Sequence, residues 1–219
     1  MKAVKAYVFD LDGTILDTMP DLAIAANEAF GQMGFPMRTQ DELLDLMGFG
    51  GRYLIQRAVP PSASPEQAQE TFEIWRSLYI ASDYAHTTPF PGVVDALVQL
   101  RSRGAKTAVL SNKFHEGVRV LSARHFPGLF DAVRGDAPPV PRKPDPTSLL
   151  QILDVLNASP DEAAYIGDTP IDVATARNAG VMAIGVSWGY DKAAPLNRDD
   201  LDAYIHDPAE LLSFLPDDE

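Results

Sequence analysis

Two carboxylates stand directly after the first apolar run of the chain. The stretch VFDLDGTILDT, residues 8–18, contains Asp10 and Asp12 at that point. Acidic residues are poor strand formers, and neighbouring carboxylates repel each other. A Mg²⁺ ion would offset this repulsion, since it binds one or two carboxylates together with substrate oxygens and water. One aspartate can then attack phosphorus while the other acts as a general acid and base. The residues alone leave open which aspartate attacks.

Further polar side chains stand at or near the ends of later apolar runs. They are Ser111, Asn112 and Lys113, then Lys143, then Asp168 and Asp172. Carboxylates, a hydroxyl, an amide and ammonium groups together suit a phosphate dianion with a divalent cation, because charge stabilisation dominates phosphoryl transfer. Each residue also has a possible structural role that involves no catalysis: a lysine can be a solvated loop residue, and a carboxylate can cap a helix. The prediction of a site therefore depends on the combination and its order.

Strand and helix patterns alternate over most of the chain. Short apolar runs predict buried strands at 6–10, 106–111, 163–168 and 181–187, and helical spacing predicts helices at 93–104, 145–157 and 169–180. This alternation predicts an α/β fold, a Rossmann-like parallel sheet with helices on both faces. Ligands of such sheets bind beyond the carboxyl ends of the strands, where the polar residues stand.

The segment from 16 to 88 has helical patterns and no convincing strand. Helices are expected at 20–34, 39–47 and 64–85, the last two with the capping-box pairs Thr39/Glu42 and Ser64/Gln67. The glycine-rich loop GFGGR at 48–52 leads into a further helix, whose N-terminal amides favour an anion. The sequence thus predicts an α/β core of residues 1–15 and 89–219 and an inserted all-helical domain of residues 16–88.

Composition excludes several classes of partner and chemistry. The 219 residues carry 31 acidic and 18 basic side chains, a net charge of -13, which disfavours nucleic acid and anionic lipid. There is no cysteine, so disulfides, thiolate nucleophiles and cysteine-bound zinc are excluded. No run approaches the roughly 18 apolar residues of a spanning helix. We expect a cytoplasmic protein with no membrane or nucleic-acid partner, and any phosphate site needs local cations.

Four short motifs occur in a fixed order. They are DLDGT at 10–14, LSN at 110–112, RKPDP at 142–146 and GDTPID at 167–172. The ordered set resembles the haloacid dehalogenase-like superfamily, in its phosphatase branch. The resemblance covers nearly the whole chain, and the helical insert stands where this family carries its cap domain.

The resemblance implies a role for each motif residue. Asp10 is expected to be the nucleophile and Asp12 the general acid and base, with Ser111 and Lys143 holding the transferring phosphoryl group. The cofactor is expected to be Mg²⁺. Its expected ligands are Asp10, Asp12 through its backbone carbonyl, Asp168, and Asp172 in a supporting role or through water.

Within the family the sequence is most similar to phosphoglycolate phosphatases. The stretches DTMPDL at 17–22, MGFGGRYLIQRA at 47–58 and SNK at 111–113 carry this likeness, although the cap loop departs from the pattern at Phe49 and Arg52. The likeness implies a small phosphorylated metabolite as substrate, with Asn112 and Lys113 as binding residues. Arg52 follows the glycine-rich loop 48–51, and there are two interpretations of it: it pairs with a substrate carboxylate, or it is a solvated side chain in the first turn of the next helix. A monomer or homodimer is expected.

Other functions use the same pattern. A phosphomutase similar to β-phosphoglucomutase has the same core, and the substrate of a phosphatase can instead be a nucleotide, a sugar phosphate or pyrophosphate. A dehalogenase is disfavoured because those enzymes lack an acid at the position of Asp12. A non-catalytic binding module on the same fold is disfavoured by the complete set of Asp10, Asp12, Ser111, Lys143 and Asp168.

Overall fold

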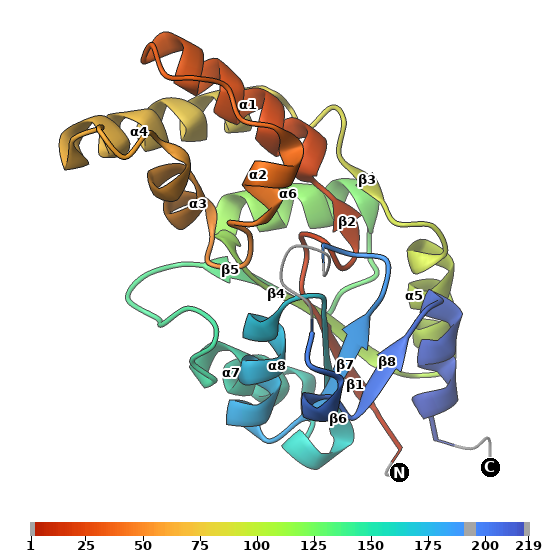
Figure 1. The fold of residues 1–219 in the computed structure, drawn as a ribbon. Coiled ribbons are helices and arrows are strands. Elements are labelled where there is room, and N and C mark those ends of the chain that lie inside the picture. The colour runs from red at the N-terminus through yellow and green to blue at the C-terminus, as the bar shows by residue number, and fades with distance from the viewer. Residues whose placement is uncertain (1–2, 191–195, 217–219) are drawn as a thin grey trace. The chain divides into compact units, whose positions relative to one another are not determined.

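The chain folds into two compact units. The computed structural model describes residues 3–190 and 196–216, and Figure 1 shows its helices and strands. One unit contains residues 1–16 and 89–219, and the other contains residues 17–88. At the two crossings between them, β2 (Leu16–Asp17) and β3 (Thr88–Pro89) pair as a small sheet. Strands this short carry no periodic pattern, so the sequence did not predict them.

The larger unit is built on a six-stranded sheet in the order β5-β4-β1-β6-β7-β8. Every neighbouring pair is parallel, which confirms the predicted α/β fold. The strands are β1 (Ala6–Phe9), β4 (Lys106–Phe114), β5 (Ala132–Asp136), β6 (Ala163–Gly167), β7 (Met182–Val186) and β8 (Ala203–Ile205). The sequence predicted β1, β4, β6 and β7. It missed β5 and β8, which are edge strands and only partly buried.

Helices cover both faces of this sheet. On one face, α7 (Thr147–Leu156) and α8 (Pro170–Ala179) pack their apolar sides onto Val8 and Tyr165. On the other, Phe9 and Ile166 face α5 (Val93–Ser102) and the 3-10 helix η3 (Pro208–Phe214) (Figure 1). Successive residues of the central strands are therefore both buried, as in parallel sheets covered on both sides. The remaining helices are α6 (His115–His125), η1 (Pro160–Glu162) and η2 (Arg198–Asp200).

The strand order places a switch point beside β1. After β1, the chain adds β4 and β5 on one side, then returns and adds β6, β7 and β8 on the other. Ligands of open parallel sheets bind beyond the carboxyl ends of the strands at such a point. Asp10 follows β1 and Asp168 follows β6, so the sheet brings both carboxylates to this edge.

The smaller unit contains four helices. They are α1 (Met19–Gln32), α2 (Gln40–Leu44), α3 (Gly51–Ala58) and α4 (Pro65–Ala81). Both predicted capping boxes are present, at Thr39 and at Ser64, although α2 ends three residues earlier than predicted. The buried Asp21 carboxylate accepts hydrogen bonds from the backbone amide of His86 and the hydroxyl of Thr87, which fastens the end of the unit to α1. Within the described ranges, no helix has the length and apolarity to cross a membrane.

Candidate active site

Three buried carboxylates gather at the switch point. The ligand oxygens of Asp10, Asp168 and Asp172 all lie within 4.8 Å of one another. Asp172 belongs to the first turn of α8, where its side chain forms a capping box with Thr169. Burial, followed by repulsion from Asp172 and Asp12, raises the pKa of Asp10 to about 7 despite the nearby Lys143. Burial and the same kind of repulsion raise the pKa of Asp168 well above its usual value.

The Asp168 carboxylate is oriented by groups that the sequence did not single out. Its Oδ1 accepts a hydrogen bond from the Thr14 hydroxyl at 2.9 Å, and its Oδ2 accepts one from the Tyr190 amide at 2.8 Å. The Trp188 indole donates to the Thr14 carbonyl at 2.9 Å. A Cβ at Gly13, where φ is +82°, would lie 2.2 Å from Asp168 Oδ2, so only glycine fits. Residues 188–190 follow β7, and their place at a strand end was the available signal.

Lys143 is the buried cation in contact with this cluster. Its Nζ lies 3.0 Å from Asp10 Oδ1, 2.7 Å from Asp172 Oδ1 and 2.9 Å from Tyr165 Oη. Burial lowers the pKa of Lys143, but attraction to Asp10 and Asp172 outweighs it, so the pKa lies well above its usual value. The three ammonium protons thus face three protein oxygens.

Asn112 holds the backbone of the lysine loop. Its Nδ2 donates to the Lys143 carbonyl at 3.1 Å, and its Oδ1 accepts from the Lys143 amide at 2.9 Å. These two bonds join the end of β4 to the loop before α7. The residue expected to bind substrate therefore contacts Lys143 in this structure.

Asp12 has a different environment from the three clustered aspartates. Its carboxylate oxygens lie 2.9 and 3.3 Å from the Nζ of Lys113, whose side chain is almost fully buried. Among the described residues, the group able to hold a metal includes Asp10, Asp168 and Asp172 but not the Asp12 carboxylate. Lys113, which was expected to bind substrate, thus pairs with the expected acid.

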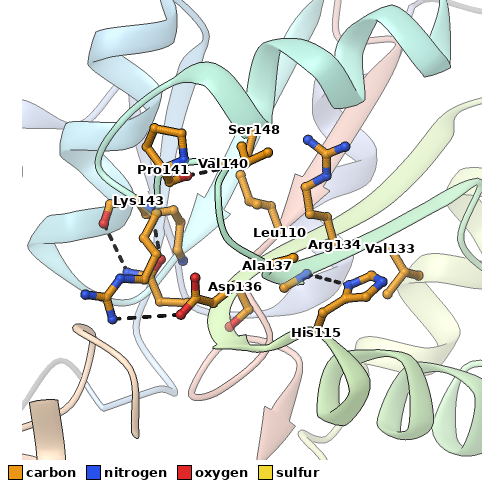
Figure 2. Close-up of a pocket in the computed structure, with 14 residues that line it drawn as sticks. Leu110, His115, Val133, Arg134, Asp136, Ala137, Val140, Pro141, Lys143 and Ser148 are labelled. Carbon is orange, nitrogen blue, oxygen red and sulfur yellow. Dashed lines mark hydrogen bonds and ion pairs between the residues drawn. The ribbon is translucent and has the colours of Figure 1, made fainter. Parts of the chain in front are cut away.

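A cavity of about 350 Å³ lies beside these residues in the larger unit. Its lining includes Ser111, Asn112 and Lys143, and Figure 2 shows Lys143 and His115 on opposite sides of the view. The Ser111 hydroxyl is buried and accepts a hydrogen bond from the Lys113 amide at 3.3 Å. His115 accepts one from the Gly135 amide at 3.2 Å. Ser111 and Lys143 therefore border the same cavity.

Arg52 lies in the first turn of α3 in the smaller unit. Its guanidinium lies 4.3 Å from the centre of the Phe72 ring, hydrogen-bonds the Gln69 side chain, and lies 3.9 Å from Glu73. Its side chain is 47% exposed. Arg52, which was expected to bind a substrate carboxylate, therefore has partners within its own unit. The Phe72 ring is buried, whereas the ion pair with Glu73 is exposed, and exposed ion pairs of this kind are weak.

The donor set fits a hard divalent cation. Three carboxylates share one buried space, and burial, followed by repulsion among them, raises the pKa values of Asp10 and Asp168. Oxygen ligands of this kind are those that Mg²⁺ and Ca²⁺ prefer, and a cation would relieve the repulsion. The arrangement can therefore hold a metal beside a carboxylate, a serine hydroxyl and a lysine ammonium.

A parallel sheet with this strand order and these carboxylates at its edge defines a class of hydrolase. The chain belongs to the haloacid dehalogenase-like hydrolase family, whose sequence profile matches residues 7–186. It is 30% identical over 213 residues to the phosphoglycolate phosphatase of Aquifex aeolicus, with 97% of each chain covered. It is 31% identical over 223 residues to that of Vibrio cholerae, with 98% of each covered.

A solved structure agrees with this assignment. A candidate phosphoglycolate phosphatase from Lactobacillus delbrueckii subsp. bulgaricus is 32% identical and superimposes with a TM-score of 0.90, covering 97% of this chain and 99% of the other. The resemblance seen in the four motifs is confirmed. The protein is an enzyme of this family, similar to phosphoglycolate phosphatases over nearly its whole length.

Proposed function

We propose that the protein is a Mg²⁺-dependent phosphatase that hydrolyses a small phosphorylated metabolite through an aspartyl-phosphate intermediate. The observation that carries this proposal is the buried group of Asp10, Asp168 and Asp172 in contact with Lys143. The relatives named phosphoglycolate phosphatase support 2-phosphoglycolate as the leading substrate.

The metal would be held by residues of two neighbouring strand ends. Asp10 and Asp168 are the proposed carboxylate ligands, with the Asp12 backbone carbonyl as a third contact. Both Asp172 oxygens already accept hydrogen bonds, from Lys143 and from Thr169, so we assign Asp172 a supporting role. When bound, Mg²⁺ would stabilise negative charge on the phosphoryl group.

Asp10 is the proposed nucleophile. Its Oδ1 accepts a hydrogen bond from the Leu11 amide at 2.7 Å and faces Lys143, whereas Oδ2 accepts none from the described residues. We therefore assign the attack on phosphorus to Oδ2. The new O–P bond forms as the bond to the leaving alcohol breaks, and Asp12 supplies the proton that this alcohol needs.

The second step returns the enzyme to its starting state. Asp12, now a carboxylate, takes a proton from water as this water attacks phosphorus, and orthophosphate leaves Asp10. Lys113 holds the Asp12 carboxylate by its ion pair. Ser111 and Lys143 are proposed to bind the oxygens of the phosphoryl group. Because each Lys143 proton already faces a protein oxygen, a phosphoryl oxygen must share or replace one of these partners.

The test is turnover of 4-nitrophenyl phosphate by the wild-type protein with Mg²⁺, with EDTA, and by Asp10→Asn. We expect turnover with Mg²⁺ only, and a loss of about a thousandfold or more in Asp10→Asn, the scale of an essential catalytic group. A panel of phosphorylated metabolites then identifies the substrate, and 2-phosphoglycolate should give the highest kcat/KM.

Three outcomes would contradict the proposal. Near-normal turnover by a folded Asp10→Asn protein would remove the proposed nucleophile. A wild-type protein that binds Mg²⁺ but turns over no phosphate ester would be a binding module. Transfer of the phosphoryl group from the enzyme to a sugar phosphate, in preference to water, would identify a phosphomutase.

A further inference from the structure

Tyr165 joins two parts of the candidate active site. It lies on β6 with its side chain buried among the residues that pack under α7 and α8. Its hydroxyl donates to the Leu110 carbonyl at 2.6 Å and accepts from the Lys143 ammonium at 2.9 Å. One buried oxygen therefore contacts both the strand that carries Ser111 and the loop that carries Lys143.

The contact to Leu110 is made where β4 becomes irregular. The pairing of β4 with β5 is regular up to Leu110 and shifts register between Leu110 and Phe114. Ser111 is the first residue after Leu110, so the register shift sets the direction of its side chain. A hydrogen bond from Tyr165 to the Leu110 carbonyl fixes the backbone just before the shift.

Three side-chain oxygens surround the Lys143 ammonium, and that of Tyr165 is the uncharged one. Asp10 and Asp172 attract the ammonium by charge, from distances of 3.0 and 2.7 Å. Tyr165 offers an uncharged oxygen at 2.9 Å, in a direction set by a side chain that is itself fixed by packing. Without this oxygen, the two carboxylates alone would decide where the ammonium rests.

We propose that Tyr165 is a positioning residue that holds the Lys143 ammonium and the Ser111 backbone in the arrangement that binds a phosphoryl group. This inference rests on the proposed phosphatase function. It assigns Tyr165 no contact with the substrate, and its effect passes through Lys143 and Ser111.

The alternative is that Tyr165 is an ordinary buried tyrosine. Tyr7 on the adjacent strand β1 is a matched control, because it is fully buried and its hydroxyl donates to the Leu211 carbonyl at 3.3 Å. Tyr7→Phe thus removes one buried hydroxyl that is bonded to a backbone carbonyl in η3 rather than to a residue of the site. Each substitution deletes one oxygen atom, and thermal midpoints show whether both variants are folded at the assay temperature.

The experiment compares wild type, Tyr165→Phe and Tyr7→Phe with 4-nitrophenyl phosphate and Mg²⁺. It measures kcat/KM, the inhibition constant of orthophosphate and the Mg²⁺ concentration for half-maximal rate. We expect Tyr165→Phe to lower kcat/KM by about tenfold or more, the scale of a hydrogen bond to a charged group, and to raise the orthophosphate constant similarly. Its Mg²⁺ requirement should change less than about twofold, and Tyr7→Phe should change all three values less than twofold.

Equal effects of Tyr165→Phe and Tyr7→Phe in an active wild-type background would overturn this inference and leave the phosphatase function standing. A change in Mg²⁺ requirement as large as the change in orthophosphate affinity would also overturn it, because the tyrosine would then support the carboxylates instead of Lys143. A wild-type protein without Mg²⁺-dependent turnover would remove the proposed function and this inference together.

Discussion

Asp12 and Asp168 are both aspartates at the carboxyl ends of the strands, but their side chains have different neighbours. Asp12 pairs with the Lys113 ammonium. Asp168 accepts neutral hydrogen bonds from Thr14 and Tyr190 and lies against two further carboxylates. A carboxylate beside an ammonium is already compensated, whereas one among like charges gains from a bound cation. The two residues should therefore respond differently to metal.

This difference is measurable as metal-dependent thermal stability. Mg²⁺ at about 100 times its Kd should stabilise the wild type by roughly 2.7 kcal/mol, a shift of several degrees in Tm. Asp168→Asn should lose most of this shift, and Asp12→Asn should keep it although both variants lose turnover. Thermal unfolding with and without Mg²⁺ checks the prediction. A shift that survives in Asp168→Asn, or disappears in a folded Asp12→Asn, would show that the ligands are wrongly assigned.

At the scale of the elements, α8 approaches β6 so closely that the last residue of the strand must be glycine. A Cβ at Gly167 would lie 2.3 Å from the Cβ and Cγ of Asp172. Asp172 in turn holds Lys143 and caps its own helix. The strand end and the helix start therefore depend on one another, and the site depends on both.

Gly167→Ala should lower the free energy of unfolding by about 1–3 kcal/mol, because overpacking displaces its neighbours. Gly31→Ala in α1 is the control, because a Cβ there meets nothing within 4 Å. Alanine is the better helix former, so Gly31→Ala should raise the free energy of unfolding by up to about 1 kcal/mol. Urea unfolding of both variants shows whether each substitution lowers or raises the free energy of unfolding. If Gly167→Ala leaves this free energy unchanged, α8 can move away from β6 at no cost, and the prediction is wrong.

A pH-dependent contact joins α5, β4 and the loop before β5. Asp131 Oδ2 lies 2.6 Å from Arg101 Nη1 and accepts from the Thr107 amide at 3.0 Å. Burial alone would raise the pKa of Asp131, but these partners outweigh it and hold the pKa below its usual value. The folded state thus prefers the charged form, and this stability is complete above the unfolded pKa of about 3.9 and is lost as pH falls through the lower folded pKa.

Asp131→Asn should therefore destabilise the protein at pH 7, by about 1–2 kcal/mol for hydrogen bonds to a charged group. The difference in the free energy of unfolding between wild type and variant should narrow below about pH 4, because the Asp131 carboxylate of the unfolded chain then takes up a proton before that of the folded chain does. Urea midpoints at pH 7 and pH 3 provide the comparison. If the difference between wild type and variant is the same at pH 7 and pH 3, the destabilisation comes from altered packing or hydrogen-bond geometry and not from the lost charge.

At the scale of the whole molecule, the net charge of -13 repels an anionic substrate at long range. Only cations close to the site, such as Lys143 and Lys113, can offset this repulsion. The proposed core residues recognise a phosphoryl group and a metal, and neither distinguishes glycolate from another alcohol. We therefore propose that the helical unit of residues 17–88 acts as a cap and provides the substrate selectivity. Its loop Gly48–Arg52 is the leading candidate.

Arg52→Ala should lower kcat/KM for 2-phosphoglycolate at least about tenfold more than for 4-nitrophenyl phosphate, a difference of roughly 1.4 kcal/mol. The expected reason is loss of a partner for the substrate carboxylate. Arg57→Ala is the matched control, because Arg57 lies in the last turn of the same helix and its guanidinium also stacks on an aromatic ring, that of Tyr53. Equal losses on both substrates would place the specificity determinant elsewhere.

The sequence by itself determined the features that depend on neighbouring residues. The order of the four motifs indicated the family, apolar runs predicted the four inner strands, and the capping boxes at Thr39 and Ser64 are where they were expected. The α/β fold class follows from the alternation of these patterns. Edge strands β5 and β8 were missed because they are partly exposed, and their residues carry no clear apolar period.

Only the tertiary structure decided which side chains meet. Lys113 and Asp12 are 101 positions apart and form an ion pair, and Tyr165 contacts Leu110 across 55 positions. Such pairs depend on the strand order, which places β1 between β4 and β6. Periodicity describes which face of an element is apolar and carries no information about which elements are neighbours. The motifs and the family resemblance predicted that Asp10, Asp168 and Asp172 would share a site, but the contacts of Lys113 with Asp12 and of Tyr165 with Lys143 emerge only from the folded structure.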